Sequence, residues 1–369
     1  MRKISRRNAI GLLGTGLICA GFPKPFNITG KAGIDLADVR RNINFHFEEL
    51  KVARAPFGTF HTGAGGVDLY SSCDIAIARS IMGEDLMGTL TDDERRQWIG
   101  CINSYQNGFD GSYSNRYGHS KLHANGMVIG ALGILGGKQR YNVKLYDAFN
   151  TIEKVGPWLE NIDWSKQWGS SHLFWGGIHC FSLSKSCSVG WLGYVFEWLN
   201  DNLDQNTGWW RKGTQYSDRH QPLGGSAHIL PIYQHHSRTF PYPERVIDSV
   251  LDMQLANGRW LGREKDRMQV MHYLELDALY VLKYTMKFAP NYRNTDITKA
   301  VERYASLVEE YWESIGSGWK KLHPHRILSA VGNFGLLQHF LPGRFEDDIQ
   351  WTDIFSDIEL YNTKKVERD

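Results

Sequence analysis

This chain of 369 residues is poor in cysteine and has neither a long apolar run nor an excess of one charge. It has five cysteines and no Cys-x-x-Cys pair, so the sequence indicates neither a thiolate zinc site nor a dithiol redox motif. The apolar stretch at residues 9–22 is too short and too glycine-rich for a stable membrane span. No segment rich in proline and serine and no block of charge marks a domain boundary. These absences predict one domain, residues 27–369, with no membrane span.

Basic residues are concentrated at the start of the chain, where Arg6 and Arg7 precede the apolar stretch. This pattern is typical of a twin-arginine export signal, which we place at residues 1–26, and it predicts a periplasmic or secreted protein. Removal of the signal changes the formal net charge from +2 to −3. The mature chain therefore lacks the bulk positive charge that attracts nucleic acid. An oxidising compartment allows its four cysteines to form bridges, although apolar surroundings favour buried thiols equally.

A glycine turn that ends in an aromatic residue recurs along the sequence. The clearest copies are Asn107–Tyr113, Thr207–Trp210 and Asn257–Trp260. Gly111 and Gly208 are 97 residues apart, close to twice the 50 residues between Gly208 and Gly258. A period of about 50 residues, with two helices per unit, is typical of helical arrays whose units bury their apolar faces against neighbours. The sequence therefore predicts an all-α fold, an (α/α)6 or (α/α)7 toroid in a single domain.

Two kinds of helix alternate in the predicted array. Apolar segments rich in small residues are expected to be inner helices, buried on all sides. They are Met127–Leu135, Val189–Leu199, Leu274–Tyr284 and Ile327–Leu341. Segments with one apolar stripe are expected to form an outer layer. They are Asp35–Val52, Thr91–Tyr105, Pro243–Gln254 and Asp296–Ser314.

Histidines gather just after the glycine turns, where the inner helices are expected to begin. This set contains His61, His119, His123, His172, His179, His220, His228, His272, His323 and His325. Because the inner helices of a toroid run in the same direction, their first turns would surround one opening and form a candidate active site. Each histidine alone is explained equally well by capping or core packing. The recurrence of histidine at one position of the repeat, beside arginine and tyrosine, indicates a catalytic site.

Two neighbouring segments, residues 218–228 and 263–273, carry the densest set of histidine, tyrosine and arginine. Such a set suits β-elimination from a uronic acid sugar. A cation or amide neutralises the carboxylate, a neutral histidine or a tyrosinate removes the C5 proton, and a tyrosine protonates the leaving oxygen. The sequence predicts a lyase that acts on an anionic polysaccharide.

Hydrolysis is the competing chemistry, because inverting glycosidases with this architecture use two carboxyl groups. Candidates near the expected opening are Asp110, Asp218, Glu264, Asp266, Glu275 and Asp277. A glycan-binding toroid without catalysis is a further alternative. The spacing of His119 and His123 would suit a metal, but no third ligand is evident in the sequence, so we assign no metal ligand and no cofactor and leave a structural ion possible. The oligomeric state stays open.

Two families resemble this chain. The pattern Gln-x-x-x-Gly-x-Trp at Gln254–Trp260 resembles the repeat of terpenoid cyclases and prenyltransferase β-subunits, but their Asp-x-Asp-Asp motif and zinc ligands are absent. The order and spacing of His228, Arg267 and Tyr273, with Gln221 upstream, are similar to polysaccharide lyase family 38, which cleaves glucuronan or alginate. That resemblance implies His228 as the base, Tyr273 as the acid, and Arg267 and Gln221 as contacts of the substrate carboxylate.

Other candidate substrate contacts surround this set, because tryptophan faces stack on sugar rings. They are His123, Asn125, His172, Trp175, Trp210, Trp260 and His272.

Overall fold

The computed structural model of this protein describes residues 33–261, 270–357 and 359–367. The predicted export signal lies outside these residues. Gly33–Asp369 forms one compact unit, and its described part is mostly helical, which confirms the predicted all-helical class. Among the described residues, no helix is long and apolar enough to cross a membrane.

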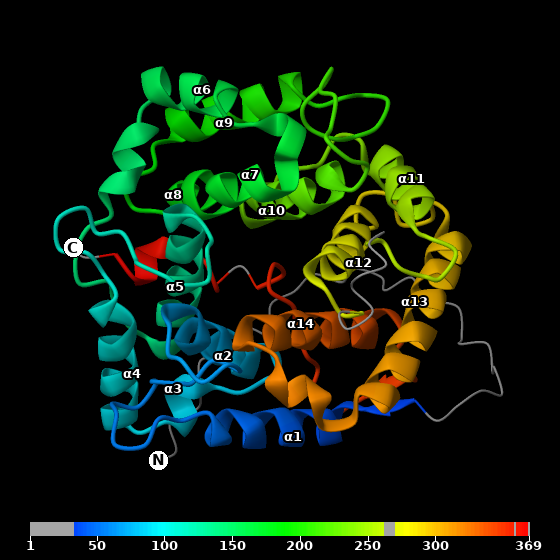
Figure 1. The fold of residues 1–369 in the computed structure, drawn as a ribbon. Helices are drawn as coiled ribbons and strands as arrows, with labels where there is room; N and C mark the ends of the chain where they lie inside the picture. The colour runs from blue at the N-terminus through cyan, green and yellow to red at the C-terminus, as the bar shows by residue number, and fades with distance from the viewer. Residues whose placement is uncertain (1–32, 262–269, 358, 368–369) are drawn as a thin grey trace, which may run out of the picture. The chain divides into compact units, whose positions relative to one another are not determined.

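Six helical segments, here called the inner segments, pack on one another in chain order. They are α2 (Leu69–Ile81), α5 (Lys121–Leu135), α7 (Gln167–Leu173) with its continuations η5 (Phe174–His179) and α8 (Cys180–Ser182), α10 (Gln221–His235), α12 (Tyr273–Thr285) and α14 (Pro324–Phe340). Each contacts the next, and α14 contacts α2, so the series of contacts closes (Figure 1). These segments are apolar because they are buried on all sides. In α12, for example, every residue from Leu274 to Leu282 is buried.

Six further helices, here called the outer helices, alternate with the inner segments along the chain. They are α1 (Leu36–Glu49), α4 (Asp92–Ser104), α6 (Ile152–Glu160), α9 (Val189–Asp201), α11 (Pro243–Met253) and α13 (Asn294–Ile315). In α13 the predicted stripe is confirmed at Ala300, Tyr304 and Val308, which are buried. The prediction that Val189–Leu199 is an inner helix is wrong. Helix α9 packs mainly on α6, and Val189 is 90% exposed, so its many aromatic residues line one face only.

The remaining elements are short. They are α3 (Leu86–Thr89), η3 (Lys144–Ala148), η4 (Trp164–Lys166), η7 (Gly316–Lys321), η8 (Thr363–Lys365), β1 (Ile34–Asp35) and β2 (Phe345–Glu346). The repeat turns adopt the backbone that their glycines predict: φ is 69° at Gly111 and 74° at Gly208, in the left-handed region that favours glycine. The four described cysteines, at 73, 101, 180 and 187, are free thiols.

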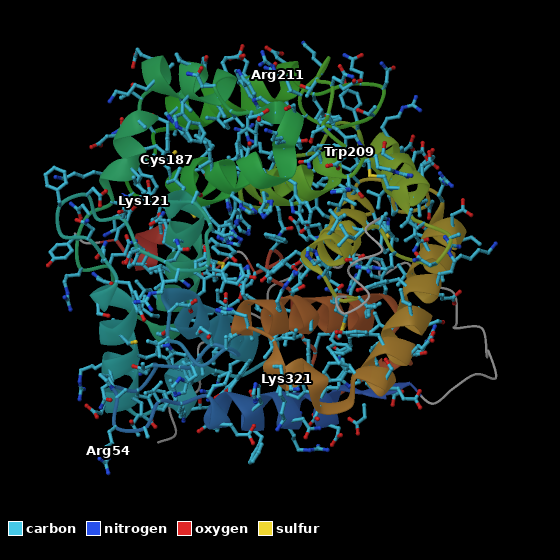
Figure 2. The ribbon with its side chains drawn as sticks, in the orientation of Figure 1. Arg54, Lys121, Cys187, Trp209, Arg211 and Lys321 are labelled. Carbon is cyan, nitrogen blue, oxygen red and sulfur yellow. The ribbon has the colours of Figure 1, made fainter. Side chains whose placement is uncertain are left out.

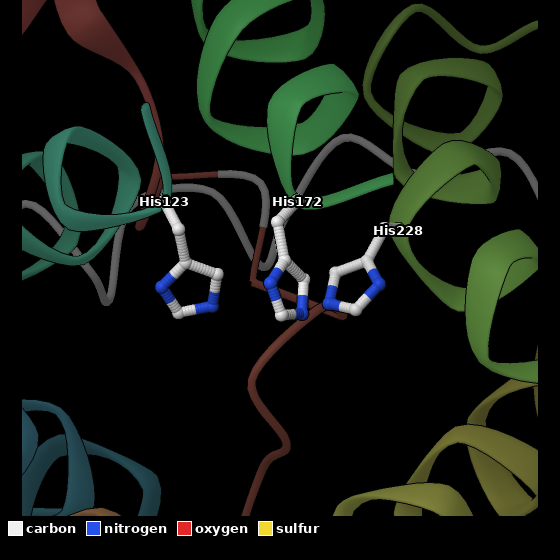
Figure 3. A group of neighbouring side chains, drawn as sticks. All are labelled: His123, His172 and His228. Carbon is white, nitrogen blue, oxygen red and sulfur yellow. The ribbon is translucent and has the colours of Figure 1, made fainter. Parts of the chain in front are cut away.

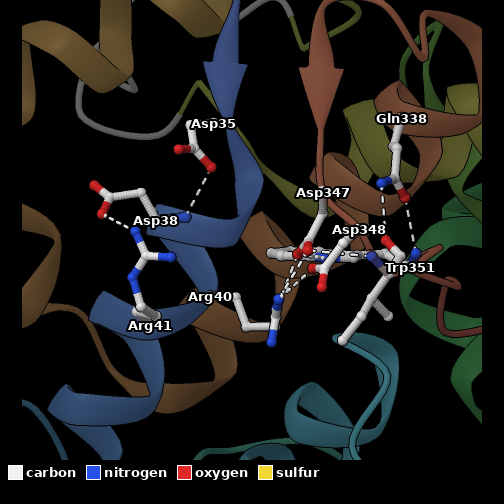
Figure 4. Close-up of polar contacts among 9 residues, drawn as sticks. Asp35, Asp38, Arg40, Arg41, Gln338, Asp347, Asp348 and Trp351 are labelled. Carbon is white, nitrogen blue, oxygen red and sulfur yellow. Dashed lines mark hydrogen bonds and ion pairs between the residues drawn. The ribbon is translucent and has the colours of Figure 1, made fainter.

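Polar contacts join the first helix to the segment that follows the last one. Strand β1 pairs in parallel with β2, and the Arg40 guanidinium donates to Asp347 Oδ1 and Oδ2 at 2.8 and 2.9 Å (Figure 4). Asp347 also accepts from Trp351 Nε1 at 2.8 Å. These contacts hold the two ends of the described unit together.

A buried ion pair attaches the C-terminal segment to α12. Lys283 Nζ donates to Asp353 Oδ2 at 2.9 Å, and the other oxygen of Asp353 accepts from the backbone N–H groups of Phe355 and Ser356, each at 2.8 Å. Burial raises the pKa of Asp353, but the charge of Lys283 and these hydrogen bonds outweigh it, so the pKa lies below its ordinary value.

We expect Asp353→Asn to lower the free energy of unfolding by about 3 kcal/mol at neutral pH, because the Lys283 charge loses its buried partner. A lowered carboxyl pKa stabilises the fold above the unfolded pKa of about 3.9. The difference from the unsubstituted protein should therefore shrink as the pH falls below that value. Urea denaturation between pH 3 and pH 8 measures it. The exposed Asp201→Asn is the control, and a pH-independent difference would contradict the assignment.

Candidate functional site

Histidine and tyrosine side chains from all six inner segments meet in one group, here called the histidine–tyrosine cluster. It consists of Tyr70 on α2, Tyr117 and His119 before α5, His123 on α5, His172 on α7, His228 on α10, Tyr273 on α12 and His325 on α14. Ring contacts run through it without a break. The ring centroids are 4.8 Å apart for His228 and His172, 4.4 Å for His172 and His123, and 4.8 Å for His325 and Tyr273. Tyr70 connects the two halves through His123 and His325.

Hydrogen bonds orient the imidazoles on one side of the cluster. His228 Nδ1 lies 2.9 Å from the Gly224 carbonyl, which only accepts, so this nitrogen carries the hydrogen and Nε2 has the free lone pair. His123 Nδ1 lies 2.5 Å from the Tyr70 hydroxyl and 3.1 Å from His119 Nδ1. The ring nitrogens of His172 form no hydrogen bond within the described part of the chain.

On the other side of the cluster, the buried carboxyl group of Asp74 contacts the imidazole of His325. His325 Nδ1 lies 3.1 Å from both oxygens of Asp74, and the Tyr273 hydroxyl donates to the His325 carbonyl at 2.8 Å. Burial raises the pKa of Asp74 well above its ordinary value and lowers the pKa of His325 well below its own. Burial therefore favours the neutral form of both groups, in which the protonated carboxyl group donates to the imidazole.

The cluster is uncharged at neutral pH. Burial lowers the pKa of His228 to about 4, and burial with neighbouring histidines lowers the pKa of His119 to about 3 and those of His123 and His172 well below the ordinary value. Burial also raises the pKa of Tyr70 and Tyr273 well above the ordinary value. The imidazoles thus present lone pairs, and the phenols keep their hydrogens.

Four predicted substrate contacts are core residues instead, and these predictions are corrected. Asn125 is 0% exposed and donates to Tyr146 Oη and the Gly176 carbonyl. Trp210 and Trp260 are also buried, and each indole N–H donates to a backbone carbonyl, of Leu199 and Val250 respectively. Trp175 is 2% exposed and packs under His123, with ring centroids 5.1 Å apart. Its ring supports the cluster and offers no face to a sugar.

Gln221 and His272 both contact Trp168. The Gln221 amide accepts from the Trp168 backbone N–H at 3.0 Å and donates to Asp218 at 2.8 Å, so it joins the starts of α7 and α10. His272 caps α12, and its ring centroid lies 5.7 Å from that of Trp168. Arg267, the predicted carboxylate contact, lies outside the described residues, as do Glu264 and Asp266.

The described carboxyl groups proposed for hydrolysis are engaged elsewhere. Asp110 accepts from Ser112 and pairs with Lys121 at 3.1 Å, and these contacts lower its pKa to about 2. Lys121 is labelled in Figure 2. Glu275 accepts from Arg259 Nε at 3.1 Å inside the core. Asp277 is buried, and burial raises its pKa well above the ordinary value. Asp218 binds the Gln221 amide.

The sequence reasoning missed Tyr70, Tyr117 and Asp74. It expected a histidine in every unit and assigned His61 to the first, but His61 forms an isolated bridge with Val67 and stays outside the cluster. Tyr70, the second residue of α2, takes that place. The signal available was Asp68, a helix cap two residues before this tyrosine.

Comparison with protein-family models, with curated proteins and with solved structures finds no match to this chain.

We expect Asp74→Asn to leave the free energy of unfolding at neutral pH unchanged or higher, because an amide also donates to His325 and avoids a buried charge. A raised carboxyl pKa stabilises the fold fully only below the unfolded pKa of about 3.9. Relative to the unsubstituted protein, the variant should therefore gain stability as the pH rises from 4 to 8, the reverse of Asp353→Asn. Urea denaturation across this range is the measurement. A loss of more than about 1 kcal/mol at pH 7 would instead indicate a charged Asp74.

Proposed function

We propose that this protein is an exported polysaccharide lyase that cleaves a glucuronan-like or alginate-like polymer by β-elimination. We further propose that the six inner segments and their six outer helices form an (α/α)6 toroid. The closed series of contacts from α2 to α14 and back supports this arrangement. In such a toroid the histidine–tyrosine cluster lies at one end of the inner ring.

The observation that carries the proposal is the convergence of neutral imidazoles and protonated phenols from all six inner segments. Elimination next to a carboxylate needs a group that accepts a proton and a group that donates one. Both are present in forms that suit neutral pH. Hydrolysis is less well supported, because the described carboxyl groups near the cluster are buried or engaged in other contacts.

His228 is the proposed base. Its Nε2 lone pair accepts the C5 proton of the uronate, and the Gly224 carbonyl stabilises the imidazolium through Nδ1–H. Because burial lowers the pKa of His228 to about 4, the C5 proton must be acidified by neutralisation of the substrate carboxylate. We assign that neutralisation to Arg267 and Gln221 on the resemblance of their spacing to the lyase family.

Tyr273 is the proposed acid. It is the first residue of α12, on the inner segment next to that of His228, and its pKa lies well above the ordinary value. As the C5–H and C4–O bonds break and the C4=C5 double bond forms, the Tyr273 hydroxyl gives its proton to the departing oxygen. The products are an unsaturated uronide and a chain with a new hydroxyl group.

The first test incubates the purified mature protein with glucuronan, alginate, pectate and glycosaminoglycans, and follows the ultraviolet absorbance of the new conjugated double bond. We expect a rise on one polymer and a loss of about 100-fold to 10,000-fold in rate for Tyr273→Phe and for His228→Ala, because each removes a proton-transfer group.

Matched controls are Tyr141→Phe, at a partly exposed ring away from the cluster, and His339→Ala, at the other end of α14. Both should keep the full rate, and thermal unfolding confirms that the variants fold. New reducing ends without absorbance would assign hydrolysis. Sugar binding that survives both cluster substitutions, without any product, would assign a binding protein.

A further inference from the structure

Three imidazoles of the cluster are placed as a set of metal ligands. His123, His172 and His228 come from α5, α7 and α10, and each offers a ring nitrogen within 4.8 Å of the other two (Figure 3). In Figure 3 the three rings lie in a row, with the ring of His172 between the other two. Only the His119–His123 pair was considered from the sequence, and the two further ligands of this set come from other segments.

The hydrogen bonds at Nδ1 of a histidine decide whether its Nε2 can bind a metal ion. A histidine that binds a metal through Nε2 keeps its hydrogen on Nδ1 and donates it to an acceptor. His228 meets this requirement, with its Nδ1 directed at the Gly224 carbonyl and at Ser171 Oγ, 2.9 and 3.1 Å away. The Ser171 hydroxyl in turn donates to the Trp168 carbonyl, so its oxygen is free to accept.

The Nδ1 of His123 lies beside two groups, the Tyr70 hydroxyl and His119 Nδ1. In the tautomer in which His123 Nδ1 donates to one of them, Nε2 is left for a ligand bond. His172 is half-buried, and its ring forms no hydrogen bond within the described residues, so no hydrogen bond is lost when it turns toward an ion.

We propose that His123, His172 and His228 bind one divalent transition metal ion of the zinc class. Three imidazoles select zinc, cobalt or nickel over magnesium or calcium, which prefer oxygen ligands. Three protein ligands leave a fourth position of a tetrahedral ion for water or an anion. No carboxylate belongs to this set of described ligands, so the bound ion keeps its full positive charge and attracts an anionic group.

Metal binding and elimination compete for one lone pair. The ion takes Nε2 of His228, the nitrogen that the proposed function uses to accept the C5 proton. The metal-loaded protein is therefore the inactive form, a consequence that rests on the proposed function. Binding of the ion itself does not rest on it.

The test uses the untagged full chain, stripped with a chelator and titrated with Co²⁺, whose visible absorption reports tetrahedral nitrogen ligation. We expect one Co²⁺ per chain, displaced by Zn²⁺ and not by Mg²⁺. His172→Ala should abolish the spectrum, because it removes the half-buried ligand. Tyr70→Phe, which removes a partner of His123, should weaken binding by about 10-fold to 100-fold. His339→Ala, on an exposed side chain, should bind as the unsubstituted protein does.

Absence of tetrahedral Co²⁺ binding by the unsubstituted protein overturns the proposal. An unchanged spectrum in His172→Ala also overturns it and places the ion elsewhere, for example at the buried pair of His179 and His235. If His172→Ala does not fold, His172→Gln takes its place. A separate lyase assay with increasing Zn²⁺ tests the competition between metal binding and elimination. Inhibition in proportion to the fraction of metal-loaded protein supports this competition. A lack of any elimination disproves the proposed lyase function and leaves the metal-binding result intact.

Discussion

Helix α14 packs against α2, so the last inner segment meets the first, and the candidate site depends on this contact. His325 belongs to α14, while its partners Asp74 and Tyr70 belong to α2. On its other side Tyr70 meets His123 of α5. Each inner segment contributes one ring, the residues before α5 contribute two more, and none of these rings has a role alone. The packing of these segments converts isolated side chains into a continuous group.

Burial determines the chemistry of that group. Protonated imidazoles at these distances would repel one another and lose their hydration, so the folded chain favours neutral rings. The same burial raises the pKa of Asp74 and of the tyrosines, which favours their protonated forms. A site rich in titratable groups is thereby without net charge, and anions must be attracted by groups around it or by a bound cation.

The periodic features were predictable from the sequence, and the contacts across the ring were not. The glycine turns at Gly111 and Gly208 and the amphipathic stripe of α13 follow from local rules of backbone and burial, and both were predicted correctly. The apolar composition of α9 suggested a helix buried on all sides. Composition alone does not show whether the apolar residues cover one face of a helix or all of them. Trp210 and Trp260 were assigned to substrate because a turn position does not reveal that the ring points inward. Tyr70 was missed because a histidine was expected at this position of the repeat, and in the first unit a tyrosine takes its place.

The sequence separation of the contacting residues indicates when the site forms during folding. The pair of Arg40 and Asp347 joins residues 307 positions apart, and the pair of Asp74 and His325 joins residues 251 apart. Neighbouring helices make contacts of short sequence separation, whose loops close at small entropic cost, while these two pairs close almost the whole chain. We therefore expect helix formation and pairing of neighbours to precede them. Far-ultraviolet circular dichroism should then reach its native value before the two halves of the cluster meet, so that the site assembles late in folding.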